Sequence, residues 1–217
     1  MLHHILAHFH KDLTLDLRQR HIIGGVFIYV IAAVFIIYLV FKEITPDEWI
    51  VLFWILLLFA ALNAFLKGFV QESPGNRLYF YLLSPVLAFF LARWIYNILY
   101  LLVVAALIWL FLHLVSPTPI VHIGWFVINV IMAVIGLAAN FTFVSMLSVK
   151  TNNQALLMAG LGLPVVIPLL LPSVQLSMQF LTETDWESIK DLFAWLIAID
   201  LIIIALGLFL IPFIWRD

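Results

Sequence analysis

Asp200 is the only acidic or basic side chain well inside one of the long apolar segments of this sequence. A carboxylate is costly in lipid, so such a group usually faces protein or water and marks a functional site. One interpretation makes Asp200 a polar group that lines a transport path. The other makes it a carboxyl group that a neighbouring helix caps, or that reaches toward the outer membrane surface. The second is favoured because no basic side chain accompanies it inside the apolar segments.

Histidines suggest two further kinds of site. His4 and His8 are one helical turn apart, a spacing that can bind a metal ion, but no third ligand follows at a suitable spacing, so we predict no metal site. His113 and His122 flank the loop LVSPTPIVHIG, and histidine is a common axial ligand of haem iron. They are candidate haem contacts, and the alternative is a pair of histidines at the level of the lipid headgroups.

Three prolines recur at intervals of four residues in the segment LGLPVVIPLLLPS, as Pro164, Pro168 and Pro172. Each proline removes a backbone donor and strains the preceding turn of a helix. In a membrane the freed carbonyl groups need partners, so such a helix should pack inside protein or face a cavity. We take the three prolines to share one face. The pattern favours a bent helix that lines a transport path or a subunit seam over a harmless static kink.

A mixed segment at 70–85, VQESPGNRLYFYLLSP, separates two apolar runs. The turn signal SPGN precedes RLYFYLLS, which predicts a short helix that ends before the closing proline. Arg77, Tyr79 and Phe80 give this helix a large semi-polar surface. Such a surface favours docking of a cytoplasmic partner, with Tyr79, Phe80 and Leu82 as anchors, because aromatic groups dominate interfaces. The alternative is a loop that lies on the lipid.

Several classes of function are disfavoured by missing motifs. The sequence has no phosphate-binding G-x-x-x-x-G-K-[ST] motif, no H-E-x-x-H and no G-x-S-x-G. Cysteine is absent, which excludes disulfides, thiolate metal sites and covalent haem attachment. The net charge of −2 comes without a basic patch, so nucleic acid is not an expected partner. We predict a protein without enzymatic activity of its own.

The composition requires a membrane. The chain is 66% hydrophobic and 10% charged, and its mean hydropathy is +1.20, whereas soluble domains are about 45–50% apolar and about 25% charged. Because about 20 apolar residues span the hydrocarbon core as a helix, we predict an all-α integral membrane protein with one permease domain over 1–217. Its six predicted spans are 23–41, 49–69, 94–115, 125–147, 155–172 and 192–214.

Basic residues predict the orientation. With the N-terminus inside, eight Lys and Arg residues lie on the inner side and two, Lys42 and Lys190, on the outer side. Both termini are therefore expected in the cytoplasm. Residues 1–22 predict an interfacial helix on the inner leaflet, and the alternative is a frayed polar tail. Its predicted apolar stripe consists of Leu2, Ile5, Leu6, Phe9, Leu13 and Leu17.

Three stretches resemble the B subunit of the cytochrome c maturation haem exporter, the CcmB family of ABC-2 type membrane permeases. They are KDLTLDLRQRH before the first span, ALNAFLKGFVQESPGNRLYFYLLSPVLAFFLARWIYN around segment 70–85, and NNQALLMAGLGLPVVIPLLLPS at the fifth span. The resemblance covers most of the chain and implies that 70–85 is a coupling helix. The residues that match the family are Glu72, Gly75, Leu78, Leu82, Leu83 and Pro85, and with Arg77, Tyr79 and Phe80 they form the predicted ATPase-coupling site.

The resemblance also implies partners and a place in the cell. It implies a separate ATPase subunit (A), a haem-handling subunit (C), a small subunit (D), a periplasmic chaperone (E) that receives the haem, and two copies of this chain. The location implied is the bacterial inner membrane, and haem is the implied cargo rather than a covalently bound cofactor. Two alternatives remain: a permease for another cargo, such as a lipid-linked glycan or a drug, and a non-transporting membrane scaffold for assembly factors.

Overall fold

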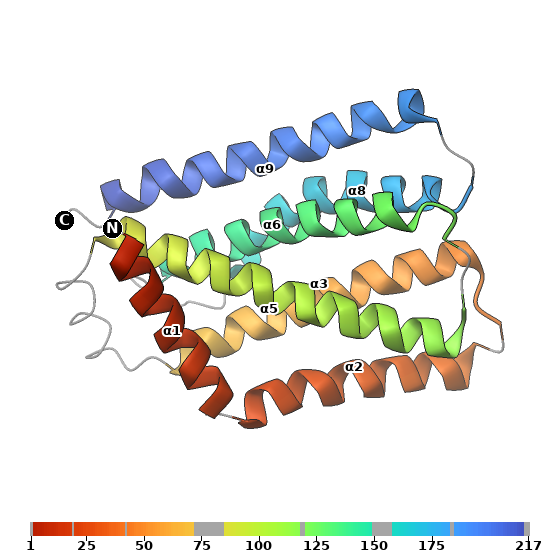
Figure 1. Cartoon of the computed structure of the whole chain (residues 1–217), viewed down its shortest axis with the longest axis horizontal. Helices are drawn as coiled ribbons and strands as arrows, with labels where there is room; N and C mark the ends of the chain where they lie inside the picture. The colour runs from red at the N-terminus through yellow and green to blue at the C-terminus, as the bar shows by residue number, and fades with distance from the viewer. Residues whose placement is uncertain are drawn as a thin grey trace.

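The computed structural model describes residues 2–18, 20–41, 43–71, 85–117, 120–148, 158–182 and 185–214. Every regular element in these ranges is a helix, and most of the helices run side by side along one bundle (Figure 1). In chain order the elements are α1 (Leu2–Arg18), α2 (Arg20–Val40), α3 (Pro46–Gln71), α5 (Val86–Val115), α6 (Ile123–Ser148), the π-helical turn η1 (Met158–Gly162), α8 (Leu163–Gln179) and α9 (Trp186–Ile214).

Five of these helices are long and apolar enough to cross a membrane, as far as the described residues show. They are α3, α5, α6, α9 and the continuous helix formed by η1 and α8. The described apolar stretch of α2, Gly24–Val40, is shorter than these five. The prediction of an all-α membrane protein is therefore confirmed, while the sixth span stays a prediction.

The central helix of the bundle is α6, which packs against α5, α8 and α9. Of its membrane-length stretch 67% is buried, compared with 28% for both α5 and α9. A helix that is apolar on all sides can either be buried in protein or face lipid, so its composition alone does not place it. The packing assigns α6 to the interior, and α5 and α9 to positions where much of each helix faces outward.

Two helices, α5 and α9, begin more than one helical turn before the predicted spans that they contain. The helix α5 starts at Val86, directly after the extended Pro85, and continues through Arg93 rather than beginning at Trp94. The Arg93 guanidinium lies 6.0 Å from the centre of the Phe89 ring, a cation–π contact that lets a charged residue remain on the helix. The helix α9 starts at Trp186, whose N–H donates to the Asp185 carboxylate at 2.8 Å.

The N-terminal helix α1 lies across one end of α5 at an angle to the other helices (Figure 1). His8 is buried and meets the Phe89 ring edge-on with centroids 5.5 Å apart, and Phe9 lies 6.3 Å from Tyr96. Leu6, a member of the predicted apolar stripe, is 64% exposed. Two crossed helices touch only over a short length. The contact of α1 with α5 therefore includes His8, which is not part of the predicted apolar stripe, together with Phe9.

Candidate functional site

The deepest polar contacts among the described residues join α6 to α8. Asn129 of α6 donates from Nδ2 to the Ser173 carbonyl at 2.8 Å and to the Ser177 hydroxyl at 2.9 Å. The Ser177 hydroxyl also accepts the Trp54 indole N–H from α3 at 3.0 Å and donates to the Ser173 carbonyl. All four side chains are buried, so this network ties three helices together inside the bundle.

A second asparagine makes the matching contact at the other end of α8. Asn140 of α6 donates from Nδ2 to the Gly162 carbonyl at 3.0 Å. Asn129 and Asn140 are about three turns apart on α6, and so are their acceptors on the antiparallel α8. The two asparagines therefore fix the register of α8 against α6 at two points about 16 Å apart.

Between these two points α8 carries the predicted prolines. Pro168 and Pro172 lie inside the helix, where they cannot donate to the carbonyls one turn earlier, and Pro164 lies in its first turn, just after η1. Pro164 and Pro168 are exposed on the described chain, whereas Pro172 is buried. Two of the three prolines thus face outward and the third faces the core, because a spacing of four residues rotates each proline away from the last.

Asp200 lies halfway along α9 and is 6% exposed. Its Oδ1 has no hydrogen-bond partner among the described residues. The carboxyl group packs against Gly136 of α6, where even a Cβ atom would collide with it and with the buried Leu169 side chain of α8. Asp200 therefore lies at the middle of α9, and Gly136 makes the space that it occupies.

The two predicted haem-contacting histidines have different surroundings. His113, in the last turn of α5, stacks on Trp109 with ring centroids 5.2 Å apart. His122 precedes α6, and its backbone N–H and that of Val121 approach the Phe180 carbonyl at the end of α8. The Nε2 atom of His122 is buried without a partner in the described part of the chain. Iron could therefore reach that nitrogen only if the imidazole or its neighbours moved.

An aromatic cluster lies next to His122. Trp125 of α6 lies 5.4 Å from Trp186 and 5.7 Å from Phe193 between ring centroids, the latter two on α9. Trp125 and Trp186 are 38% and 50% exposed. Exposed tryptophans at helix ends are typical of the membrane–water interface, so this cluster fits one boundary of the bilayer.

The predicted ATPase-coupling site lies almost wholly outside the described residues. This applies to Glu72, Gly75, Arg77, Leu78, Tyr79, Phe80, Leu82 and Leu83. Of that site only Pro85 is described, as the residue before α5. The segment that contains the site connects α3 to α5, two helices that pack against each other.

Sequence reasoning missed the residues that hold α8 and accommodate Asp200. Asn129 and Asn140 are polar residues within a predicted span, and their spacing of about three turns puts them on one helix face. That signal was sufficient to predict a polar face on α6. No comparable signal marked Gly136, whose role depends on a residue 64 positions later in the chain.

Comparison with known proteins identifies a family. The family model described as CcmB protein matches residues 3–216, which is nearly the whole chain. No curated protein and no solved structure matches the chain.

Proposed function

This chain belongs to the CcmB family, and we propose that it is the membrane subunit of an ABC transporter complex that delivers haem for cytochrome c assembly, driven by a separate ATPase. The family indicates a multi-pass membrane permease of haem export in cytochrome c biogenesis, not a catalytic enzyme. The match over residues 3–216 carries the proposal. The proposal includes four finer points: an ATPase partner, haem as the cargo, the ABC-2 type of the permease, and association with the subunits C and D.

The proposed topology has six spans with both termini in the cytoplasm of a bacterium. The helix α2 has 21 residues, about 31 Å of helix, which matches a hydrocarbon core of about 30 Å. It runs beside α3 and α5 along the length of the bundle, and the first turn of α1 and the last turn of α9 lie at the same end of the molecule (Figure 1). An even number of spans is consistent with that arrangement.

Energy would enter this subunit through segment 70–85. The sequence has no phosphate-binding motif, so a nucleotide must act on it from a partner. A docking helix can shift a two-state bundle only if it binds the partner differently in the two states. The segment is joined to α3, and the α3 residue Trp54 donates to Ser177 of α8. This contact gives a continuous physical route from the docking segment to the proline-containing helix.

The outward side of α8 is the proposed seam. Pro164 and Pro168 are exposed there, with Ile167 at 60% and Leu171 at 57% exposure. Pro172 of α8 and Asp200 of α9 face the interior of the bundle. They would lie on the side of these two helices that is opposite the proposed seam. In this proposal a second copy of the chain packs on the exposed side of α8, while the α6 contacts hold the opposite side.

Haem contact within this chain is the finest part of the proposal. His113 lies in the last turn of α5 and His122 directly precedes α6, three residues before the exposed Trp125. Because the His122 Nε2 atom is buried, we expect haem iron to reach this nitrogen only after a local rearrangement of the imidazole or its neighbours. A permease for another cargo would not need either imidazole.

Purification of the tagged chain from its native membrane tests the proposed complex. We expect an ATPase and other cytochrome c maturation subunits to co-purify, with ATP turnover and a haem absorption spectrum in the preparation. Recovery with an ATPase and glycan-assembly proteins instead would indicate a different cargo. Recovery without any ATPase would contradict the transporter and favour a scaffold.

A double substitution, Phe80→Asp with Leu82→Asp, tests the coupling site within that complex. We expect the ATPase to be lost from the purified complex because two apolar anchors become charged. The matched control, Phe80→Tyr with Leu82→Met, keeps the size and apolar character and should retain the ATPase. Equal ATPase recovery with both variants would overturn the assignment of segment 70–85, provided that both are present in the membrane at wild-type levels.

A further inference from the structure

The carboxyl group of Asp200 is enclosed where α9 packs on α6. A Cβ atom on Gly136 would collide with the Asp200 Oδ1 atom and with the side chain of Leu169, which is itself fully buried. A bound water needs room for about one water-sized sphere and two to four polar partners. The contact between Asp200 and Gly136 offers neither, so water does not reach this oxygen from the α6 side.

The two helices that pack most extensively on α9 supply no charge to balance this carboxyl group. Neither α6 nor α8 contains an acidic or basic residue, a histidine or a tyrosine. One turn from Leu169, the Ser173 hydroxyl already donates to the Leu169 carbonyl at 2.9 Å. One turn from Gly136, the Asn140 amide donates to the Gly162 carbonyl. Both of these donors are therefore directed at the backbone of α8.

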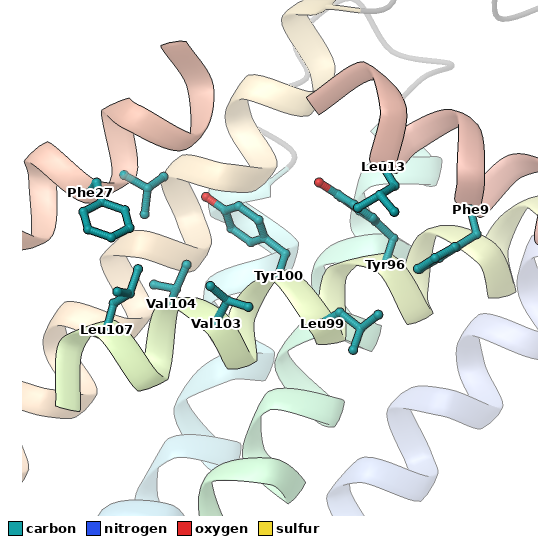
Figure 2. Close-up of a pocket in the computed structure, with 10 residues that line it drawn as sticks. Phe9, Leu13, Phe27, Tyr96, Leu99, Tyr100, Val103, Val104 and Leu107 are labelled. Atoms are coloured by element: carbon teal, nitrogen blue, oxygen red, sulfur yellow. The ribbon is translucent and has the colours of Figure 1, made fainter. Parts of the chain in front are cut away.

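The titratable residues of α5, which also contacts α9, are engaged elsewhere. The Arg93 guanidinium lies over the Phe89 ring of its own helix. His113 is in the last turn of α5, where it stacks on an indole ring. Tyr96 and Tyr100 line a separate cleft between α5 and the helices α1 and α2 (Figure 2). Within the described residues, none of these groups is a hydrogen-bond partner of the buried carboxyl oxygen.

The other charged residues of α9 are too far along the helix to act as partners. Glu187, Lys190 and Asp191 lie in its first two turns, and the last of them is about 13 Å before Asp200 along the axis. Lys190 forms an ion pair with Glu187. The carboxyl group therefore has no cation beside it in the part of the chain that the structure describes.

This environment favours one chemical form of the group. An ionised carboxylate in an apolar interior is very unfavourable unless a cation, a hydrogen-bond donor or water accompanies it, and a group without them takes up a proton instead. A neutral carboxyl group with an unpaired oxygen costs far less. Since the closed contact leaves Oδ1 none of these partners, the packing of α9 on α6 is compatible with the neutral acid and not with the anion.

We propose that Asp200 is a proton-binding site, which keeps its proton while α9 packs on Gly136 and releases it when the two helices separate. On release the O–H bond breaks, its electron pair stays on the carboxylate, and the proton passes to a water molecule that enters the opened contact. Rebinding of the proton allows the contact to close again. The site uses only contacts among α5, α6, α8 and α9, so it does not rest on the proposed transport function.

Infrared spectroscopy of the purified complex at neutral pH tests the protonation state directly. Asp200→Asn keeps the shape of the side chain and removes the titratable group. The matched control is Asp191→Asn, because Asp191 is an exposed acid on the same helix. We expect the wild-type spectrum minus that of Asp200→Asn to show the C=O stretch of one protonated carboxyl group per chain. The difference spectrum for Asp191→Asn should show an ionised carboxylate only.

Transfer of the wild type to D₂O tests the closed contact, because the protonated carboxyl band shifts when deuterium replaces its hydrogen. We expect a delayed shift in the wild type. Gly136→Ala should make it about tenfold faster, because the added methyl group strains the contact. Gly124→Ala, on the same helix and in open space, should leave the rate unchanged.

Three results would overturn the inference. The first is an ionised carboxylate in the difference spectrum of Asp200→Asn, which would show that the site holds no proton. The second is an immediate band shift of the wild type in D₂O, which would show that water already reaches the group. The third is an equal rate of shift in the wild type and both glycine variants. Because the wild type alone supplies the first two tests, they stand even if Gly136→Ala does not fold.

Discussion

The two sides of this bundle are held together in different ways. On one side α6, α8 and α9 meet through buried polar side chains: two asparagines that are hydrogen-bonded and one aspartate whose Oδ1 is not, within the described residues. On the other side the described contacts of α1 and α2 with α5 include three pairs of aromatic rings, and a cleft of about 200 Å³ lies between these helices. In lipid, apolar side chains gain little by leaving the solvent, so specific register requires polar contacts or close packing.

This difference explains where a proline-containing helix can be tolerated. Proline interrupts the hydrogen bonds that hold a helix to itself, so α8 needs outside contacts to keep one position. Asn129 and Asn140 supply those contacts at both ends of the proline segment. The helices α2 and α5 contain no proline, and the cleft beside them shows that they pack less closely there.

Gly136→Ala should have the largest effect on stability, a loss of about 1–3 kcal/mol. The added methyl group would collide with Asp200 and Leu169, which are 6% and 0% exposed and have little room to move. The matched control on the same helix is Gly124→Ala, which meets nothing within 4 Å and should be neutral. Unfolding in a graded series of sodium dodecyl sulfate measures both.

The double variant Gly136→Ala with Asp200→Ala sharpens this prediction. Removing the carboxyl group takes away one of the two colliding groups, so part of the lost stability should return. If the double variant is less stable than Gly136→Ala alone, the close contact between α6 and α9 is not the cause of the loss.

Asn129→Leu should have the next largest effect, about 1–2 kcal/mol, because it removes two hydrogen bonds inside the membrane. Asn140→Leu removes one and should cost about 0.6 kcal/mol. Leucine has the same branching as asparagine, so packing changes little in either case. The same unfolding series ranks the two variants, and the reverse order would break the proposed link between hydrogen bonding and the position of α8.

Asp200→Leu should have the smallest effect and the opposite sign. A buried polar atom without a partner is unfavourable, so leucine should leave the unfolding midpoint unchanged or raise it slightly. The comparison with Asn129→Leu is direct because both variants replace a branched polar side chain with the same apolar one. A loss as large as that of Asn129→Leu would show that Asp200 has a partner in the assembled complex. Haem delivery by Asp200→Leu shows separately whether the carboxyl group serves transport.

The helical membrane fold could be predicted because each apolar segment is long enough to span a bilayer on its own. The limits of the segments were harder to predict, because charged residues such as Arg93 and Glu187 lie on helices that continue past the hydrocarbon core. The candidate site was predicted in part. The prolines of α8 and Asp200 were found from their chemical types, whereas the residues that contact them were not.

The sequence by itself determined that this protein lives in a membrane, belongs to the CcmB family and carries a proline-containing helix with a single acid in a later span. Composition, spacing and motif are local properties of the chain, so they can be read along it. Tertiary structure alone decided that Asn129 and Asn140 hold both ends of α8, that Gly136 makes room for Asp200, and that α1 leaves a cleft above α5. Each of these depends on which faces of distant helices meet, and an all-round apolar helix carries no signal of its facing direction.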